Sequence, residues 1–209
     1  MAAAQHIASS RDTRGAILAE ATRLFQQHGV DGFSMRQIAG AIGFSATTIY
    51  LYFKDKNDLM YAVCVAGFEE FGASLSQAAT SHEDPLDRLR ALGSAYIEFA
   101  LTHPLHYDVM FIRPKAWAIG AMVDQRVGTD RADPPSLAGL VDAVQAAVDA
   151  GALHERTGDV RELAMRLWAG LHGVAALAIS MNDQIAGLDP VAVRARAAEV
   201  TEALLIASQ

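Results

Sequence analysis

A run of hydroxyl, phenol and ammonium side chains between positions 45 and 56 carries the clearest chemical pattern in this chain. Threonine hydroxyls donate and accept hydrogen bonds, and their methyl groups can meet a thymine methyl. Tyrosine and lysine suit phosphate oxygens. Together these groups suit a surface that reads DNA bases and holds the phosphate backbone. The candidate DNA-contact residues of this run are Ser45, Ala46, Thr47, Thr48, Tyr50, Leu51, Tyr52 and Lys56.

A short helix is predicted to precede this run and to support it. Ser34 followed by Gln37 forms a capping box, which satisfies otherwise unpaired amides at a helix start. Ile38 and Ile42 fall on one face at helical spacing. Gly43 supplies the left-handed residue that ends a helix, so a tight turn should follow.

A second helix is predicted directly after that turn. Ser45 can cap it, and Ile49 and Phe53 fall on the same inward side, which leaves the polar residues outward. Two short helices with a glycine turn and an outward polar face describe a helix-turn-helix. The alternative is a helical hairpin inside an all-helical core. A core hairpin would carry aliphatic side chains where Thr47 and Thr48 stand, so we favour the DNA-binding interpretation.

At these positions the chain resembles the TetR family of bacterial one-component transcriptional regulators. The resemblance rests on Ile38-Ala39, Gly43-Phe44-Ser45, the segment Ile49–Phe53, Lys56 and Leu59. The chain departs from the family pattern at Phe44, where a small aliphatic side chain is more usual. A second departure is Gly40, a poor helix former.

The resemblance implies a transcriptional regulator, a repressor in the favoured interpretation, that binds operator DNA and senses a small apolar effector. It places DNA contact at Arg36, whose guanidinium can pair with a guanine edge or a phosphate. The alternative for Arg36 is a solvated surface arginine. Thr47 and Thr48 would read bases, while Tyr52 and Lys56 would hold the backbone.

The composition indicates an all-α protein. The chain has 209 residues, of which 52% are hydrophobic, and it lacks the alternating runs typical of strands. We expect an N-terminal arm and helix-turn-helix domain over 1–56, and a ligand-binding and dimerisation domain over 57–209. Residues 1–10 are expected to form an irregular arm. The single cysteine, Cys64, suits a reducing cytosol, and no secretory signal or membrane span is evident, so a cytoplasmic location is expected.

The charge distribution permits DNA binding, although the formal net charge is −7. Up to Met60, six Lys and Arg residues stand against five acidic ones, which gives +1. The remainder of the chain carries −8. The negative charge is therefore concentrated away from the predicted DNA-binding face.

Capping residues predict further helix boundaries. Gly29 should end the first helix, and Asp55 should begin the fourth. Asp84 followed by Pro85 is a strong start for the fifth helix, and Asp189 with its following proline should open the last one.

Large aromatic, methionine and histidine side chains recur at helical spacing in the C-terminal part. They could enclose a cavity for a small apolar molecule, with histidines supplying the few polar contacts. The alternative is that each side chain simply packs in the core. The pattern around His103 and Tyr107, with Trp168, His172 and Gly173, is similar to a TetR subgroup with a tryptophan-histidine-glycine motif. The candidate ligand-binding residues are Tyr96, Phe99, His103, Tyr107, Met110, Phe111, Trp117, Trp168 and His172, and Met122 and Met165 belong to the same apolar set.

A homodimer is expected because helix-turn-helix proteins bind two half-sites about 34–36 Å apart, or a multiple of that. The helix that begins near position 136 and the strongly apolar helix from about Asp159 to Asn182 are expected to form a four-helix bundle with the partner's copies. The candidate interface residues are Leu137, Val141, Val144, Gly170, Gly173 and Ala176.

No metal, cofactor or enzymatic chemistry is predicted. His103, His106 and Asp108 suggest a metal site, but Pro104 interrupts them and no further ligand fixes a geometry. No catalytic Ser-His-Asp or Cys-His pattern and no Gly-rich phosphate loop occurs in the sequence. Two rivals remain open: a DNA-binding or architectural factor controlled by a protein partner, and a helical carrier or enzyme with a vestigial DNA head.

Overall fold

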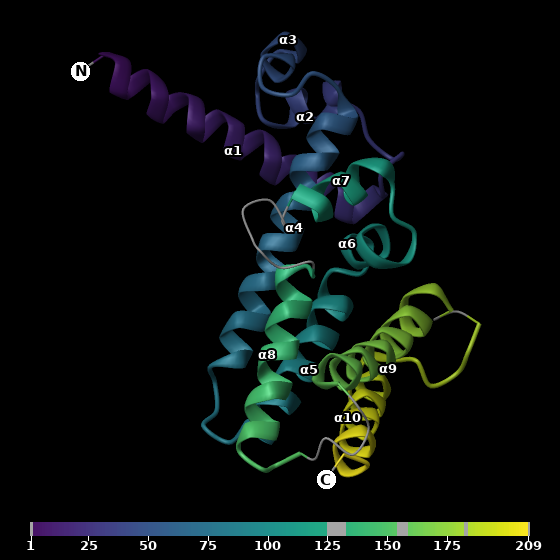
Figure 1. Ribbon diagram of the computed structural model, residues 1–209. Coiled ribbons are helices and arrows are strands. Elements are labelled where there is room, and N and C mark those ends of the chain that lie inside the picture. Colours follow the sequence, from purple (N-terminus) through teal and green to yellow (C-terminus); the bar gives the residue numbers. More distant parts are fainter. Residues whose placement is uncertain (1, 125–132, 154–158, 182–183, 209) are drawn as a thin grey trace.

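The computed structural model describes residues 2–124, 133–153, 159–181 and 184–208, with side chains described from residue 12 onward. The described chain contains helices and no strand, as the sequence predicts (Figure 1). In chain order the elements are α1 (Ala2–His28), α2 (Met35–Ala41), α3 (Ala46–Tyr50), α4 (Lys56–Ala79), α5 (Pro85–Thr102), α6 (Pro104–Tyr107), the π-helical turn η1 (Asp108–Ile112), α7 (Ala116–Asp124), α8 (Pro135–Asp149), α9 (Val160–Ser180) and α10 (Pro190–Ile206).

The predicted helix starts are confirmed by the caps. Ser34 Oγ accepts a hydrogen bond from the Gln37 amide at 3.3 Å, and Gln37 Oε1 accepts one from the Ser34 amide at 2.8 Å. Asp55, Asp84 and Asp189 each accept from backbone amides in the first turn of the helix that follows. These bonds satisfy amides that have no partner within the helix.

The irregular arm expected at the N-terminus is wrong for residues 2–10, which are part of α1. No glycine or proline precedes Gly15 in this segment, and three consecutive alanines follow Met1. Alanine has the highest helix propensity, so local preference extends the helix toward the terminus.

The protein has an N-terminal head, formed by α1 to α3, whose hydrophobic core is shared with the start of α4. Leu59, Met60 and Val63 of α4 belong to this core, and so does Val109 of η1. The head therefore extends beyond the boundary expected at residue 56, because its core is closed by the first turns of α4.

The remainder of α4 belongs to the C-terminal core. Phe68 and Phe71 pack there with side chains of α5, η1 and α9. Figure 1 shows α4 running from the head into the C-terminal part, with α5 and α8 beside it and α9 and α10 farther away. A single continuous helix thus connects the two parts.

The two parts also meet where α6 contacts α1. His106 of α6 is 3% exposed, and its ring lies edge-on to Phe25 of α1 with centroids 4.8 Å apart. Gly67 of α4 allows this approach, since a Cβ there would lie 2.9 Å from His106 Cδ2. His106 Nδ1 is buried without a hydrogen-bond partner among the described residues.

Burial lowers the pKa of His106 from 6.5 to about 4, with a smaller contribution from nearby His103. His103 in turn lies 3.3 Å from Glu70. His106 is therefore neutral at pH 7, which suits its apolar surroundings.

We predict that His106 alone lowers the free energy of unfolding by about 3 kcal/mol as the pH falls from about 6.5 to about 4. The unfolded histidine takes up a proton near pH 6.5, whereas the folded one resists protonation until about pH 4. The unfolded state therefore binds more protons in this window, and acid favours it. Urea unfolding at pH 7, 5.5 and 4 should show a smaller loss for His106→Phe than for the wild type.

The matched control for this prediction is His82→Gln, which replaces an exposed histidine. It should follow the wild-type pH dependence. Equal losses in the wild type and His106→Phe would contradict a buried neutral imidazole at this position.

Candidate functional site

The tip of the head is a helix-turn-helix formed by α2 and α3. Gly43 has a φ of 73°, the left-handed conformation required by the turn between them. Ser45 Oγ accepts a hydrogen bond from the Thr48 amide at 3.1 Å and lies 2.9 Å from the Thr48 hydroxyl. Ile49 is fully buried and fixes α3 to the head core. These contacts determine which side chains of α3 face outward.

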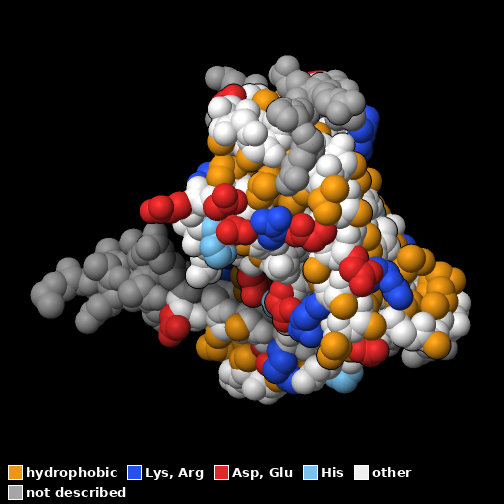
Figure 2. Space-filling model, turned by 90° about the horizontal axis from the view of Figure 1, so that it is seen from below, with side chains coloured by type: hydrophobic (Ala, Val, Ile, Leu, Met, Phe, Trp, Pro, Cys, Tyr) orange, Lys and Arg blue, Asp and Glu red, His pale blue; other side chains and the backbone are white. Residues whose placement is uncertain are grey.

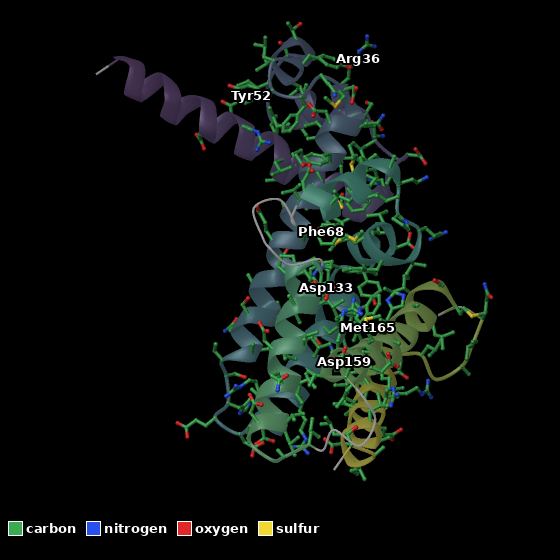
Figure 3. All side chains as sticks on the ribbon, in the orientation of Figure 1. Arg36, Tyr52, Phe68, Asp133, Asp159 and Met165 are labelled. Carbon is green, nitrogen blue, oxygen red and sulfur yellow. The ribbon has the colours of Figure 1, made fainter. Side chains whose placement is uncertain are left out.

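Several predicted DNA-contact residues are free on the surface. Thr47 is exposed, Tyr50 is 52% exposed and Leu51 is 79% exposed. Arg36 is exposed on α2 and makes no hydrogen bond or ion pair with the described residues. Figure 3 shows Arg36 pointing away from the head, with Tyr52 on the opposite side. This surface offers a guanidinium, a hydroxyl and a phenol to a partner.

Two other predicted contact residues have roles within the head. The Thr48 hydroxyl is already bonded to Ser45. The Lys56 ammonium donates to the Phe33 carbonyl oxygen and lies 4.3 Å from the centre of the Phe33 ring. Lys56 therefore holds the segment before α2 against α4, a role that the sequence did not suggest.

A cavity of about 480 Å³ lies in the C-terminal part, between α4, α5, η1, α7, α8 and α9. Its wall is mainly aliphatic and aromatic. Five of the predicted ligand-binding residues line it, namely Tyr96, Met110, Phe111, Trp168 and His172, together with Met122 and Met165. A cavity of this size and lining suits a small apolar molecule.

The other four predicted ligand-binding residues do not line the cavity. Phe99 stacks on His103 with ring centroids 4.8 Å apart, and His103 faces Glu70. Tyr107 is fully buried behind the wall. Trp117 packs against both hydrophobic cores. Helical spacing placed these residues on inward faces but could not distinguish a cavity wall from a filled core.

Sequence reasoning missed the contributions of α4 and α8 to the wall. Phe68, Phe71 and Leu75 recur at helical spacing on α4, a signal that is present in the sequence but also typical of ordinary core packing. Leu137 and Leu140 add the wall of α8.

A chain of hydrogen bonds connects four side chains at one end of the cavity. Trp168 Nε1 donates a hydrogen bond of 3.1 Å to the Tyr96 hydroxyl oxygen. The same Tyr96 oxygen lies 2.6 Å from the Tyr107 hydroxyl oxygen. The Tyr107 oxygen lies 2.8 Å from His172 Nδ1. Burial raises the pKa of Tyr96 to about 12 and also raises that of Tyr107, and it lowers the pKa of His172. All four groups are therefore neutral near pH 7.

The expected interface residues on α8 face the interior of the protomer. Val144 is completely buried, Val141 packs against the same core cluster, and Leu137 lines the cavity. The outward positions of α8 carry Asp142, Gln145 and Asp149. The apolar face of α8 packs against α4, α5 and α9 of the same chain, which leaves the interface expected on α8 as an untested prediction with little apolar surface to support it.

The expected interface residues on α9 divide into two groups. Gly170 faces α10, since a Cβ there would lie 2.8 Å from Val200 Cγ1, so it belongs to packing within the chain. Gly173 faces open space, with no atom within 4 Å of a Cβ placed there, and Ala176 is half-buried. Gly173 and Ala176 thus remain candidates for an interface.

The outward sides of α9 and α10 carry some exposed large apolar side chains. Leu177 is exposed, Val191 is 74% exposed and Ile206 is 65% exposed. Hydrophobic side chains gather on the side of the molecule that carries the end of α9 (Figure 2). By length and composition α9 could also cross a membrane, a test that core helices of soluble proteins pass as well.

Two of the residues considered for a metal site, Asp108 and His103, contact other charged side chains of the protein. Asp108 accepts two hydrogen bonds from Arg113 at 2.9 and 3.0 Å. His103 lies against Glu70, and the rings of His103 and His106 are 6.0 Å apart. Within the described ranges, no group of three or more metal-ligating side chains comes together.

Comparison with known proteins identifies both parts of the chain. Residues 17–63 match the family described as bacterial regulatory proteins, tetR family, and residues 89–205 match the tetracyclin repressor-like C-terminal domain. These are families of regulatory proteins, in agreement with the expectation that the chain is not an enzyme.

Individual proteins resemble this chain in sequence or in fold. The HTH-type transcriptional regulator AcrR of Shigella flexneri is 36% identical over 94 residues, which are 44% of this chain and 44% of that protein. The matched region thus spans less than half of that curated relative's length. A protein of unknown function from Rhodococcus sp. RHA1 has a TM-score of 0.71 at 26% identity, covering 93% of this chain and 94% of its own.

SmeT, the repressor of the Stenotrophomonas maltophilia multidrug efflux pump SmeDEF, has a TM-score of 0.66 at 19% identity. The match covers 93% of this chain and 89% of SmeT, and it shows a shared fold.

We predict that Ser45→Ala lowers the free energy of unfolding by about 1 kcal/mol, because the Thr48 amide loses the side-chain oxygen that caps α3. The matched control is Thr47→Ala, which removes an exposed hydroxyl two residues later and should change stability little. Urea unfolding measures both differences. If the two variants were equally stable, the cap would contribute nothing to the head.

Proposed function

The chain belongs to the tetR family of bacterial regulatory proteins, and we propose that it is a dimeric transcriptional repressor that releases its operator when a small apolar molecule enters the C-terminal cavity. The observation that carries the proposal is the combination of an exposed helix-turn-helix with a cavity of about 480 Å³ in one chain. Such a protein acts where the chromosome is, in the cytoplasm.

DNA binding is supported by the outward groups of α2 and α3. Arg36 and Thr47 are exposed, and no contact with the described residues occupies either side chain. The first residues of the second helix of a helix-turn-helix contact base edges in the major groove. We assign base contact to Arg36 and Thr47, and backbone contact to Tyr50 and Tyr52.

Control by a small molecule is supported by the cavity itself. A regulator controlled only by a protein partner would have no need for an unfilled apolar space, and filling it would stabilise the fold. SmeT, which shares this fold, is described as a repressor, and the proposed role of this chain as a repressor is compatible with that description.

A path of direct contacts could carry the signal from the cavity to the head. Met110 and Phe111 of η1 line the cavity, and η1 continues α6, whose His106 packs against Phe25 of α1. On the other side, Phe68 of α4 lines the cavity as well. A ligand that fits better when these elements are displaced would favour a head position unsuited to the operator, by no more than its difference in affinity for the two states.

We place the dimer interface on α9 and α10 instead of α8 and α9. The outward faces of α9 and α10 carry Leu177, Val191 and Ile206, which would be covered by a second copy of the chain. Two helices from each protomer would form a four-helix bundle around a two-fold axis. The polar outer face of α8 then remains in solvent.

We predict that Arg36→Ala weakens binding to operator DNA by about 1–3 kcal/mol and relaxes the preference at one base pair of each half-site. The operator would first be selected from genomic fragments by the purified protein. Titrations against single-base variants at several salt concentrations measure the effect. Lys115→Ala, which removes one exposed positive charge outside the head, serves as the control and should bind normally. Identical behaviour of the two variants would remove Arg36 from the DNA contacts.

We predict that Gly173→Glu converts the dimer to monomers and thereby weakens operator binding, because it places a charge in the proposed interface. Gly139→Glu on α8 is the matched control, since a Cβ at Gly139 also meets no atom within 4 Å. Sedimentation at micromolar concentration should show monomers for the first variant and dimers for the second. The reverse result would return the interface to α8.

A further inference from the structure

The hydrogen-bond chain at the end of the cavity determines where its protons lie. The Trp168 indole can only donate, so it gives its proton to the Tyr96 oxygen. If Tyr96 then donates to the Tyr107 oxygen at 2.6 Å, and Tyr107 donates to His172 Nδ1 at 2.8 Å, the indole proton and both hydroxyl protons have acceptors.

The opposite direction leaves one proton without an acceptor. If His172 carried its proton on Nδ1, it would donate to Tyr107, and Tyr107 would donate to Tyr96. The Tyr96 hydroxyl proton would then find no acceptor among these four side chains. An unsatisfied polar hydrogen in a buried position is costly. The first direction instead leaves over the Nε2 proton of His172, whose ring is only half-buried, whereas Tyr96 is 5% exposed. The leftover donor is less costly on His172, which favours Nδ1 as the acceptor and places the proton of the neutral imidazole on Nε2.

His172 Nε2 makes no hydrogen bond with the part of the chain that the structure describes. Among the described residues, His172 makes hydrogen bonds and ring contacts with Tyr96, Tyr107 and Trp168 alone, and both hydrogen bonds use Nδ1. It lines the cavity, whereas Tyr107 on its Nδ1 side is fully buried behind the wall. Nε2 is also not among the buried atoms that lack a partner, so this atom retains some accessible surface.

The described part of the cavity wall offers no free cation to a negatively charged molecule. Arg161 is the one Lys or Arg among the described lining residues, and it binds Asp133 through two hydrogen bonds of 2.7 and 3.1 Å. Asp159 and Glu162 also lie close enough to act on the Arg161 charge. Asp133 lines the cavity together with Met165, and both are labelled in Figure 3. A carboxylate would meet negative charge here.

We propose that the effector is an uncharged, largely apolar molecule with one oxygen acceptor of the carbonyl type, and that this oxygen accepts a hydrogen bond from His172 Nε2. The inference rests on the proposed function, since it describes the molecule that the cavity would sense. It also explains the tryptophan-histidine pair of α9, because Trp168 begins the chain of donors that fixes the His172 tautomer.

Matched probes test the proposal. Benzophenone and diphenylmethane have nearly the same shape but differ in the carbonyl oxygen, and diphenylacetate adds a negative charge. Calorimetric titration of the dimer should show benzophenone binding about tenfold more tightly than diphenylmethane, the usual effect of one hydrogen bond in an apolar site. Diphenylacetate should bind more weakly than benzophenone.

Variants of His172 test whether this residue causes the tighter binding of benzophenone relative to diphenylmethane. His172→Phe should bind benzophenone and diphenylmethane equally. His172→Gln can accept from Tyr107 and donate to the ligand, so it should retain the preference. Equal affinities in the wild type, a preference that survives in His172→Phe, or tighter binding of diphenylacetate would each overturn the proposed ligand class. Failure of all three probes to bind or to release operator DNA would instead overturn the proposed ligand control and this inference with it.

Nitrogen NMR of histidine-labelled protein tests the tautomer without any ligand. The His172 signal is identified by its absence in His172→Phe. We expect a neutral ring protonated on Nε2 at pH 7, and protonation on Nδ1 would overturn the assignment.

Discussion

The structure depends on α4 belonging to two hydrophobic cores at once. Leu59 and Val63 close the core of the head, and Phe68 and Phe71, one to two turns later, form the wall of the C-terminal cavity. Consecutive turns of a helix are joined by backbone hydrogen bonds, so a shift of one part of α4 is passed to the next. The close approach of His106 to Gly67 adds a second contact between the parts at the same level of the helix. Head and cavity are therefore mechanically connected through packed side chains.

Two histidines mark the ends of this connection, and each retains a polar atom in apolar surroundings. Among the described residues, His106 Nδ1 has no partner where the ring packs against Phe25, and Nε2 of the cavity-lining His172 has none either. A buried donor or acceptor without a partner costs more than an apolar group of the same shape. This cost applies to His106 Nδ1, whereas His172 Nε2 is not fully buried, and a ligand in the cavity would supply its acceptor. At His106 the ring contact with Phe25 joins α6 to α1.

The head could be predicted from the sequence in detail because its determinants are local. Ser34 with Gln37, Gly43 and Ser45 specify the helix ends, and the spacing of Ile38 and Ile49 gives the buried face. The C-terminal part could be predicted only as a set of helices. Periodicity shows that one face of α8 is buried, but it does not show whether Val144 is covered by the same chain or by a partner. In the same way Phe68 and Phe99 look alike in sequence, yet only Phe68 borders the cavity.

In the proposed mechanism, a ligand in the cavity changes the relative position of the two heads of a dimer. A spin label on Asp31→Cys, an exposed position next to the helix-turn-helix, allows the distance between the heads of a dimer to be measured by pulsed electron resonance. Cys64 should stay unlabelled because it is fully buried and burial raises its thiol pKa to about 12. We expect saturating benzophenone to shift the distribution of distances between the two spin labels by several ångströms in the absence of DNA. Superimposable distributions under conditions where benzophenone releases the operator would contradict it.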